Sequence, residues 1–78
     1  MRATVIYENA SDQSPIEIFE NISARDAAML IPDGKYFRYN NDVYEVKYSD
    51  KNVVSDGGSV HVTTCVGIKY IEGIEHTE

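Results

Sequence analysis

Residues 21–34, NISARDAAMLIPDG, decide the fold because they hold the one segment with clear helical signals. Ser23 can cap the free N–H groups at a helix start, and Asp26 stands three residues later, where a capping-box acid belongs. Apolar residues then recur at helical spacing as far as Ile31, and Pro32 cannot continue a helix. We therefore expect one helix of about eight residues, too short to persist alone in water, that packs on a sheet.

Two strands are expected before this helix. Residues 3–8 alternate so that Ala3, Val5 and Tyr7 face the same side, which is the pattern of a strand. The NASDQS segment that follows has turn composition. Pro15 then opens a second apolar run, and proline is tolerated at the first residue of a strand. The two runs are predicted to pair as a hairpin.

After the helix, the chain carries only strand and turn signals. Strand composition fills residues 35–39, 43–48, 53–54 and 60–71. Turn composition separates these runs at residues 40–42, 50–52 and 55–59. Gly67 lies inside the last run and indicates a bulge or bend.

The predicted fold class is α+β, with the order β-β-α-β-β-(β)-β. We expect a mostly antiparallel, curved sheet of about five strands with one short helix. Hairpin turns argue against parallel pairs, because a parallel connection needs a dozen or more residues. Residues 1–72 are predicted to form a single domain, and residues 73–78 a frayed acidic C-terminal tail.

Composition restricts the class of protein. The chain has 78 residues and a formal charge of −6, a sign that repels phosphate backbones and anionic lipid. Nucleic acid is therefore an unfavourable partner. The lone Cys65 cannot form an intramolecular disulfide, and no apolar run approaches the roughly 20 residues that span a bilayer. We expect a soluble, cytoplasmic protein without membrane association.

No residue pattern predicts catalysis. Cys65 and His61 stand four apart in a predicted strand, which separates their α-carbons by roughly 13 Å, too far for a dyad or a shared metal. His76 has two carboxylate neighbours, but a tail lacks the fixed geometry of a metal site. No phosphate-binding loop, nucleophile elbow or metalloprotease motif occurs. We expect no enzyme activity, no metal and no cofactor.

Tyrosine is the one distinctive feature of the composition, with six residues and no tryptophan. Most of them surround the predicted hairpin at residues 36–48, together with charges of both signs. Tyrosine and arginine are enriched at interface hot spots, although tyrosine is also an ordinary strand former. The candidate binding residues are Tyr36, Arg38, Tyr39, Tyr44 and Lys69.

These observations favour a small, acidic, non-catalytic protein that acts by protein–protein interaction, as an adaptor, inhibitor or blocker. Accessory proteins of phages and mobile elements share this size and acidity. One alternative is a homo-oligomer that binds a small anionic ligand at a subunit interface, and another is a structural component of a larger assembly. A homodimer or higher oligomer is expected in each case, because one short helix covers only part of a sheet.

Overall fold

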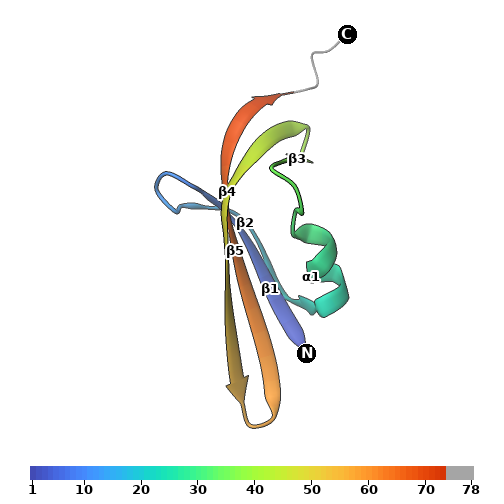
Figure 1. Ribbon diagram of the computed structural model, residues 1–78. Helices are drawn as coiled ribbons and strands as arrows, with labels where there is room; N and C mark the ends of the chain where they lie inside the picture. The colour runs from blue at the N-terminus through green and yellow to red at the C-terminus, as the bar shows by residue number, and fades with distance from the viewer. Residues whose placement is uncertain (74–78) are drawn as a thin grey trace.

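The computed structural model describes residues 1–73 as one sheet with a single helix (Figure 1). Of the tail predicted at residues 73–78, Gly73 belongs to the last strand, and residues 74–78 lie outside the described residues. The elements in chain order are β1 (Arg2–Asn9), β2 (Pro15–Ser23), α1 (Ala24–Leu30), β3 (Tyr36–Tyr39), β4 (Asp42–Asp56) and β5 (Ser59–Gly73).

The five strands lie in the order β2-β1-β5-β4-β3. Three of the four neighbouring pairs are antiparallel, whereas β1 and β5 are parallel, from Arg2 opposite His61 to Asn9 opposite Ile68. The α+β class with one curved sheet and one short helix is therefore confirmed. The argument against any parallel pair was wrong, because the whole segment from β2 to β4 connects β1 to β5 and is long enough for a crossover.

Strand β4 is one continuous element of 15 residues, so the turn expected at residues 50–52 is absent. Asp50, Lys51 and Asn52 instead pair with Cys65, Thr64 and Thr63 of β5. Every residue of β4 from 49 to 56 is exposed. Because neither side of this segment is buried, its sequence lacks the apolar–polar alternation by which a strand is recognised. Pairing with a long neighbouring strand outweighs the local turn preference here.

Local signals were read correctly around the helix and the tight turns. Ser23 is the N-cap of α1, and its Oγ accepts a hydrogen bond from the Asp26 backbone N–H at 3.1 Å. The turn between β3 and β4 uses Asn40 and Asn41 at φ values of 56° and 67°, which asparagine tolerates. Pro15 begins β2 as expected.

The core lies between α1 and the side of the sheet that faces it. Alternate residues of β1 are buried there, as predicted, and they meet alternate residues of β5. Tyr7 is 3% exposed and donates a hydrogen bond from Oη to the Leu30 carbonyl oxygen, which ties the end of α1 to β1. The buried side chains are Ala3, Val5, Tyr7, Ala27, Thr64, Val66 and Ile68.

A bend divides the sheet into two parts (Figure 1). It lies where Val46 opposes Ile68 and Tyr48 opposes Gly67, so that Lys47 is an extra residue on β4. The bulge expected at Gly67 is therefore present, with the inserted residue on the partner strand. Above the bend, the sheet consists of β3, the start of β4 and the end of β5. Below the bend, the remainder of β4 pairs with the start of β5, and β1 and β2 extend the sheet on the other side of β5.

Candidate binding face

The upper part of the sheet separates the five predicted binding residues onto two faces. Tyr36 opposes Glu45, which opposes Lys69, so these three side chains share the face directed away from the core. Arg38 lies on that face too, because it is two residues from Tyr36 on β3. Tyr39 and Tyr44 occupy the other face. The five predicted residues therefore do not form one patch, and their role in binding stays a prediction. The face that carries Tyr36, Arg38 and Lys69 is considered first as a binding surface.

Tyr39 and Tyr44 belong to an aromatic cluster built around Tyr7. The Tyr7 ring centroid lies 5.1 Å from that of Tyr39 and 5.5 Å from that of Phe37, both edge to face. Tyr44 then stacks on Phe37 and Tyr39 at 6.0 and 6.4 Å. Alternation along a strand puts Phe37 and Tyr39 on one side together, and here that side is the apolar one.

The Tyr39 hydroxyl closes this cluster with a hydrogen bond across the molecule. Its Oη donates to Glu17 Oε1 of β2 at 2.6 Å. Loss of hydration, helped by the Glu17 carboxylate, raises the pKa of Tyr39 to about 12. Tyr39 therefore acts as a hydrogen-bond donor that joins β3 to β2, a structural role.

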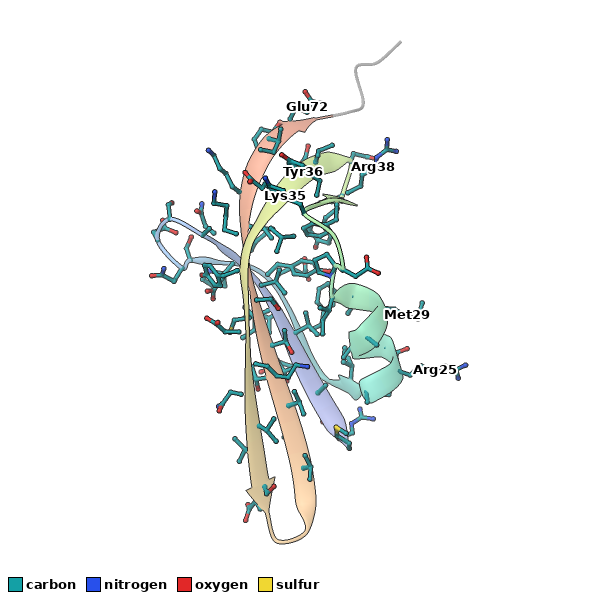
Figure 2. The ribbon with its side chains drawn as sticks, viewed as in Figure 1. Arg25, Met29, Lys35, Tyr36, Arg38 and Glu72 are labelled. Atoms are coloured by element: carbon teal, nitrogen blue, oxygen red, sulfur yellow. The ribbon has the colours of Figure 1, made fainter. Side chains whose placement is uncertain are left out.

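We define the basic face as the outward side chains of this upper part, which gather at one end of the molecule, away from Arg25 and Met29 on α1 (Figure 2). Tyr36 is 56% exposed on it. The Lys35 ammonium lies 5.8 Å from the Tyr36 ring centroid, within range of a cation–π contact. The members of the basic face are Lys35, Tyr36, Arg38, Val43, Glu45, Lys47, Lys69 and Glu72.

Charge is distributed unevenly between this face and the remainder of the described chain. The basic face holds four of the protein's seven Lys and Arg residues against two carboxylates. The other described residues hold Arg2, Arg25 and Lys51 against nine carboxylates. An acidic protein thus carries a local positive patch, which composition alone does not reveal.

Glu45 is the centre of the charge pattern on the basic face. Its Oε2 lies 3.9 Å from both the Lys35 and the Lys47 ammonium nitrogens. Its side chain is only 17% exposed, whereas the two lysine side chains are 67% and 46% exposed. Exposed ion pairs at this distance are worth little, so the lysines keep most of their capacity to bind a partner's anions.

A depression adjoins the basic face where β1 ends and β5 continues paired only with β4. Its lining residues are Asn9, Ala10, Ser11, Lys47, Lys69 and Tyr70. The Ala10 N–H donates to the Ile68 carbonyl oxygen at 2.9 Å, which fixes the β1–β2 loop beside β5. The candidate set from the sequence contains Lys69 but neither Lys47 nor the loop, although alternation along residues 43–48 already places Lys47 on the face of Glu45. The loop contact depends on the β1–β5 pairing, for which the sequence has no local signal.

Two potentially reactive side chains of the described residues, Cys65 and His61, lie on β5 below the bend. Cys65 pairs with Asp50 and Ile6, and burial raises the pKa of its thiol, with smaller contributions from Glu8 and Asp50. A thiol that stays protonated is a poor nucleophile. The His61 Nε2 lies 2.9 Å from Thr4 Oγ1, within hydrogen-bonding distance. Within residues 1–73, no group of three or more His, Cys, Asp or Glu side chains could hold a metal ion.

Comparisons with known proteins add no identification. No family model, no curated protein and no solved structure matches this chain. Across the described part of the chain, no helix has the length and apolar character needed to cross a bilayer.

Proposed function

We propose that this chain is a non-catalytic binding protein that captures a protein partner on its basic face. The observation that carries the proposal is the concentration of four exposed cationic side chains around Tyr36 on an otherwise acidic domain. Structural needs do not explain this concentration, because the aromatic packing of the same strands is on the opposite face.

Tyr36 and Arg38 are suited to the centre of such an interface. Both lie on β3, a strand of four residues at the edge of the sheet, so no further strand of the described chain covers that side. A tyrosine ring buries large apolar area while losing few rotamers, and a guanidinium forms two parallel hydrogen bonds with a carboxylate. These properties make both residue types frequent hot spots.

The pattern of charge favours a protein partner whose surface carries charges of both signs, with carboxylates at its centre. Glu45 and Glu72 lie among the cations of the basic face, and Val43 lies between Arg38 and Glu72 in the register of β3, β4 and β5. A partner that is a continuous polyanion would meet both carboxylates and lose favourable energy at each. A protein surface can instead offer carboxylates to Arg38 and Lys69 and donors to Glu72.

The test compares variants of the basic face in affinity capture from the native host. A Tyr36→Ala/Arg38→Ala double variant should lose the partner retained by the wild-type protein. Tyr36 and Arg38 are solvent-exposed, so the substitutions should leave the far-ultraviolet circular dichroism and the melting temperature unchanged. The matched control is Arg25→Ala/Met29→Ala, which removes one cation and one exposed apolar side chain from α1; Met29 is 80% exposed. Retention by the control and loss by the double variant supports the proposal. Equal retention by both variants contradicts it.

A small anionic ligand is the second candidate, favoured by the depression beside Lys47 and Lys69. The depression has a volume of about 470 Å³, which matches the lower range of small-molecule sites. The Tyr70 ring packs edge to face on Tyr44 on the other side of the sheet, so the contacts expected for a ligand are those with the Lys47 and Lys69 ammonium groups. Native mass spectrometry distinguishes the two functions, because extra mass lost in Lys47→Ala/Lys69→Ala but kept in Tyr36→Ala/Arg38→Ala would indicate a ligand in the depression.

A further inference from the structure

The lower half of β4 has an unpaired edge. β3 covers only Asp42 to Glu45, and the Val46 N–H makes one further bond, to the Lys35 carbonyl oxygen, at 2.7 Å. From Ser49 to Asp56, β4 pairs on the β5 side alone. Such a row of free backbone groups is a template for another strand.

The other edges of the sheet carry backbone features that block pairing, whereas residues 49–56 of β4 are protected only by the charged side chains Asp50, Lys51 and Asp56. β2 begins with Pro15 and is interrupted by a bulge at Asn21, where φ is 54°. β3 has only four residues. Residues 49–56 of β4 have no proline, no register shift and no positive φ. Charges exclude only strands that bring like charges against them, so this edge is open to a strand whose charges complement Asp50, Lys51 and Asp56.

The direction of the free groups follows from the pairing above the bend. The Val46 N–H points away from β5, and Tyr48 pairs with Gly67 after the inserted Lys47. Because the hydrogen-bonding direction alternates along a strand, the outward groups below the bend belong to residues 49, 51, 53 and 55. These four residues provide N–H donors and C=O acceptors for an added strand.

We propose that the occupant is β4 of a second copy, paired antiparallel about a two-fold axis at Asn52. Charge selects this register. An axis at Lys51 would oppose two lysines, and an axis at Val53 would oppose Asp50 and Asp56 at both ends. With the axis at Asn52, Lys51 opposes Val53 and Asp50 opposes Val54, so no like charges stand directly opposite each other. This register also gives a longer ladder than an axis at Val54, which would pair only residues 52–56.

The side chains of the edge agree with this arrangement. Val53 and Val54 are 56% and 51% exposed on opposite sides of the strand. In the dimer, the partner's Lys51 can lay its aliphatic stem on Val53, with the ammonium kept in water. The two Asn52 amides meet at the axis and can hydrogen-bond to each other. The product is one continuous sheet through both copies, distinct from the basic face and independent of the proposed function.

Sedimentation velocity of the full chain tests the dimer. The wild-type protein should have twice the monomer mass of 8.8 kDa, and Val53→Pro should have the monomer mass. Proline removes an outward N–H, which an edge strand tolerates, so the monomer fold should persist in circular dichroism. The matched control is Val53→Ala, which shortens the same side chain, keeps the N–H and should remain mostly dimeric. A monomeric wild type, or a Val53→Pro variant as dimeric as the wild type, overturns the proposal.

Cysteine cross-linking tests the register in a Cys65→Ala background. Asn52→Cys should form an intermolecular disulfide, because residues at the axis face each other as a non-hydrogen-bonded pair with α-carbons about 4.5 Å apart. Val54→Cys should stay reduced, because position 54 opposes residue 50 of the second copy. The two cysteines are then four residues apart along the strand. Cross-linking of Val54→Cys in place of Asn52→Cys would refute the register.

Discussion

Replacing Gly67 by alanine should destabilise the fold even though the backbone there does not require glycine. Gly67 has no positive φ, unlike Gly57 and Gly58 at 58° and 88°. The restriction comes from the Tyr48 ring, which lies across the glycine: an added Cβ would be 2.2 Å from Tyr48 Cε2 and Cζ. The ring would have to move by roughly 1.5 Å to reach ordinary carbon–carbon spacing.

The hydrogen bond from Tyr48 Oη to Glu8 Oε2 resists that movement, since Glu8 is on β1. Tyr48 can still rotate toward solvent, so the cost should fall in the lower half of the overpacking range. We expect Gly67→Ala to lower the free energy of unfolding by about 1–2 kcal/mol. For a domain of this size, each kcal/mol lowers the melting temperature by about 4–8 °C.

Urea denaturation at one fixed protein concentration, repeated in a Tyr48→Ala background, provides the decisive comparison. Without the ring, the same Gly67→Ala substitution should become neutral or stabilise by up to about 1 kcal/mol, because alanine restricts the unfolded chain more than glycine does. The sign of the effect should therefore reverse between the two backgrounds. An equal loss of stability in both would refute the role assigned to Tyr48.

Two further predictions concern ionisation. Because the folded pKa of Tyr39 is raised to about 12, the free energy of unfolding should fall as the pH rises from about 10 to 12, and Tyr39→Phe should flatten that part of the curve in denaturation experiments. Since burial raises the pKa of Cys65, iodoacetamide at pH 8 should alkylate the thiol much more slowly in the native protein than in urea, as mass spectrometry can follow. A native rate equal to the denatured rate would show that the thiol is freely accessible.

Sequence reasoning succeeded where a structure depends on neighbouring residues. The Ser23 cap, the Asn40-Asn41 turn and the alternation of β1 each depend on interactions within a few positions. The parallel β1–β5 pair and the unbroken β4 depend on contacts between segments far apart in the chain. In residues 50–52, a polar sequence on an exposed edge is compatible with both a turn and a strand. Only the opposing strand determines which one forms.

The candidate site was partly accessible to the same reasoning. Alternation along residues 36–39 already separates Tyr36 and Arg38 from Phe37 and Tyr39, and the structure has that separation. Recognising the Phe37 side as core would also have predicted that Tyr39 and Tyr44 pack in one aromatic cluster with Phe37. Alternation along residues 43–48 likewise places Lys47 on the face of Glu45, and the structure has the two side chains in contact there. The inserted residue at the bend has no comparable local signal beyond Gly67.

The basic face also changes how the net charge of −6 bears on partners. Charges are screened over about 8 Å at physiological ionic strength, so a bound partner responds mainly to the side chains next to it. For a partner at the basic face, these are four cations and two carboxylates, whereas the excess of acid lies elsewhere on the described chain. The net charge still acts at longer range, where it slows the approach of polyanions such as nucleic acid. A compact protein surface with a small acidic centre avoids most of that repulsion and still meets Arg38 and Lys69, which is why we favour a protein as the partner.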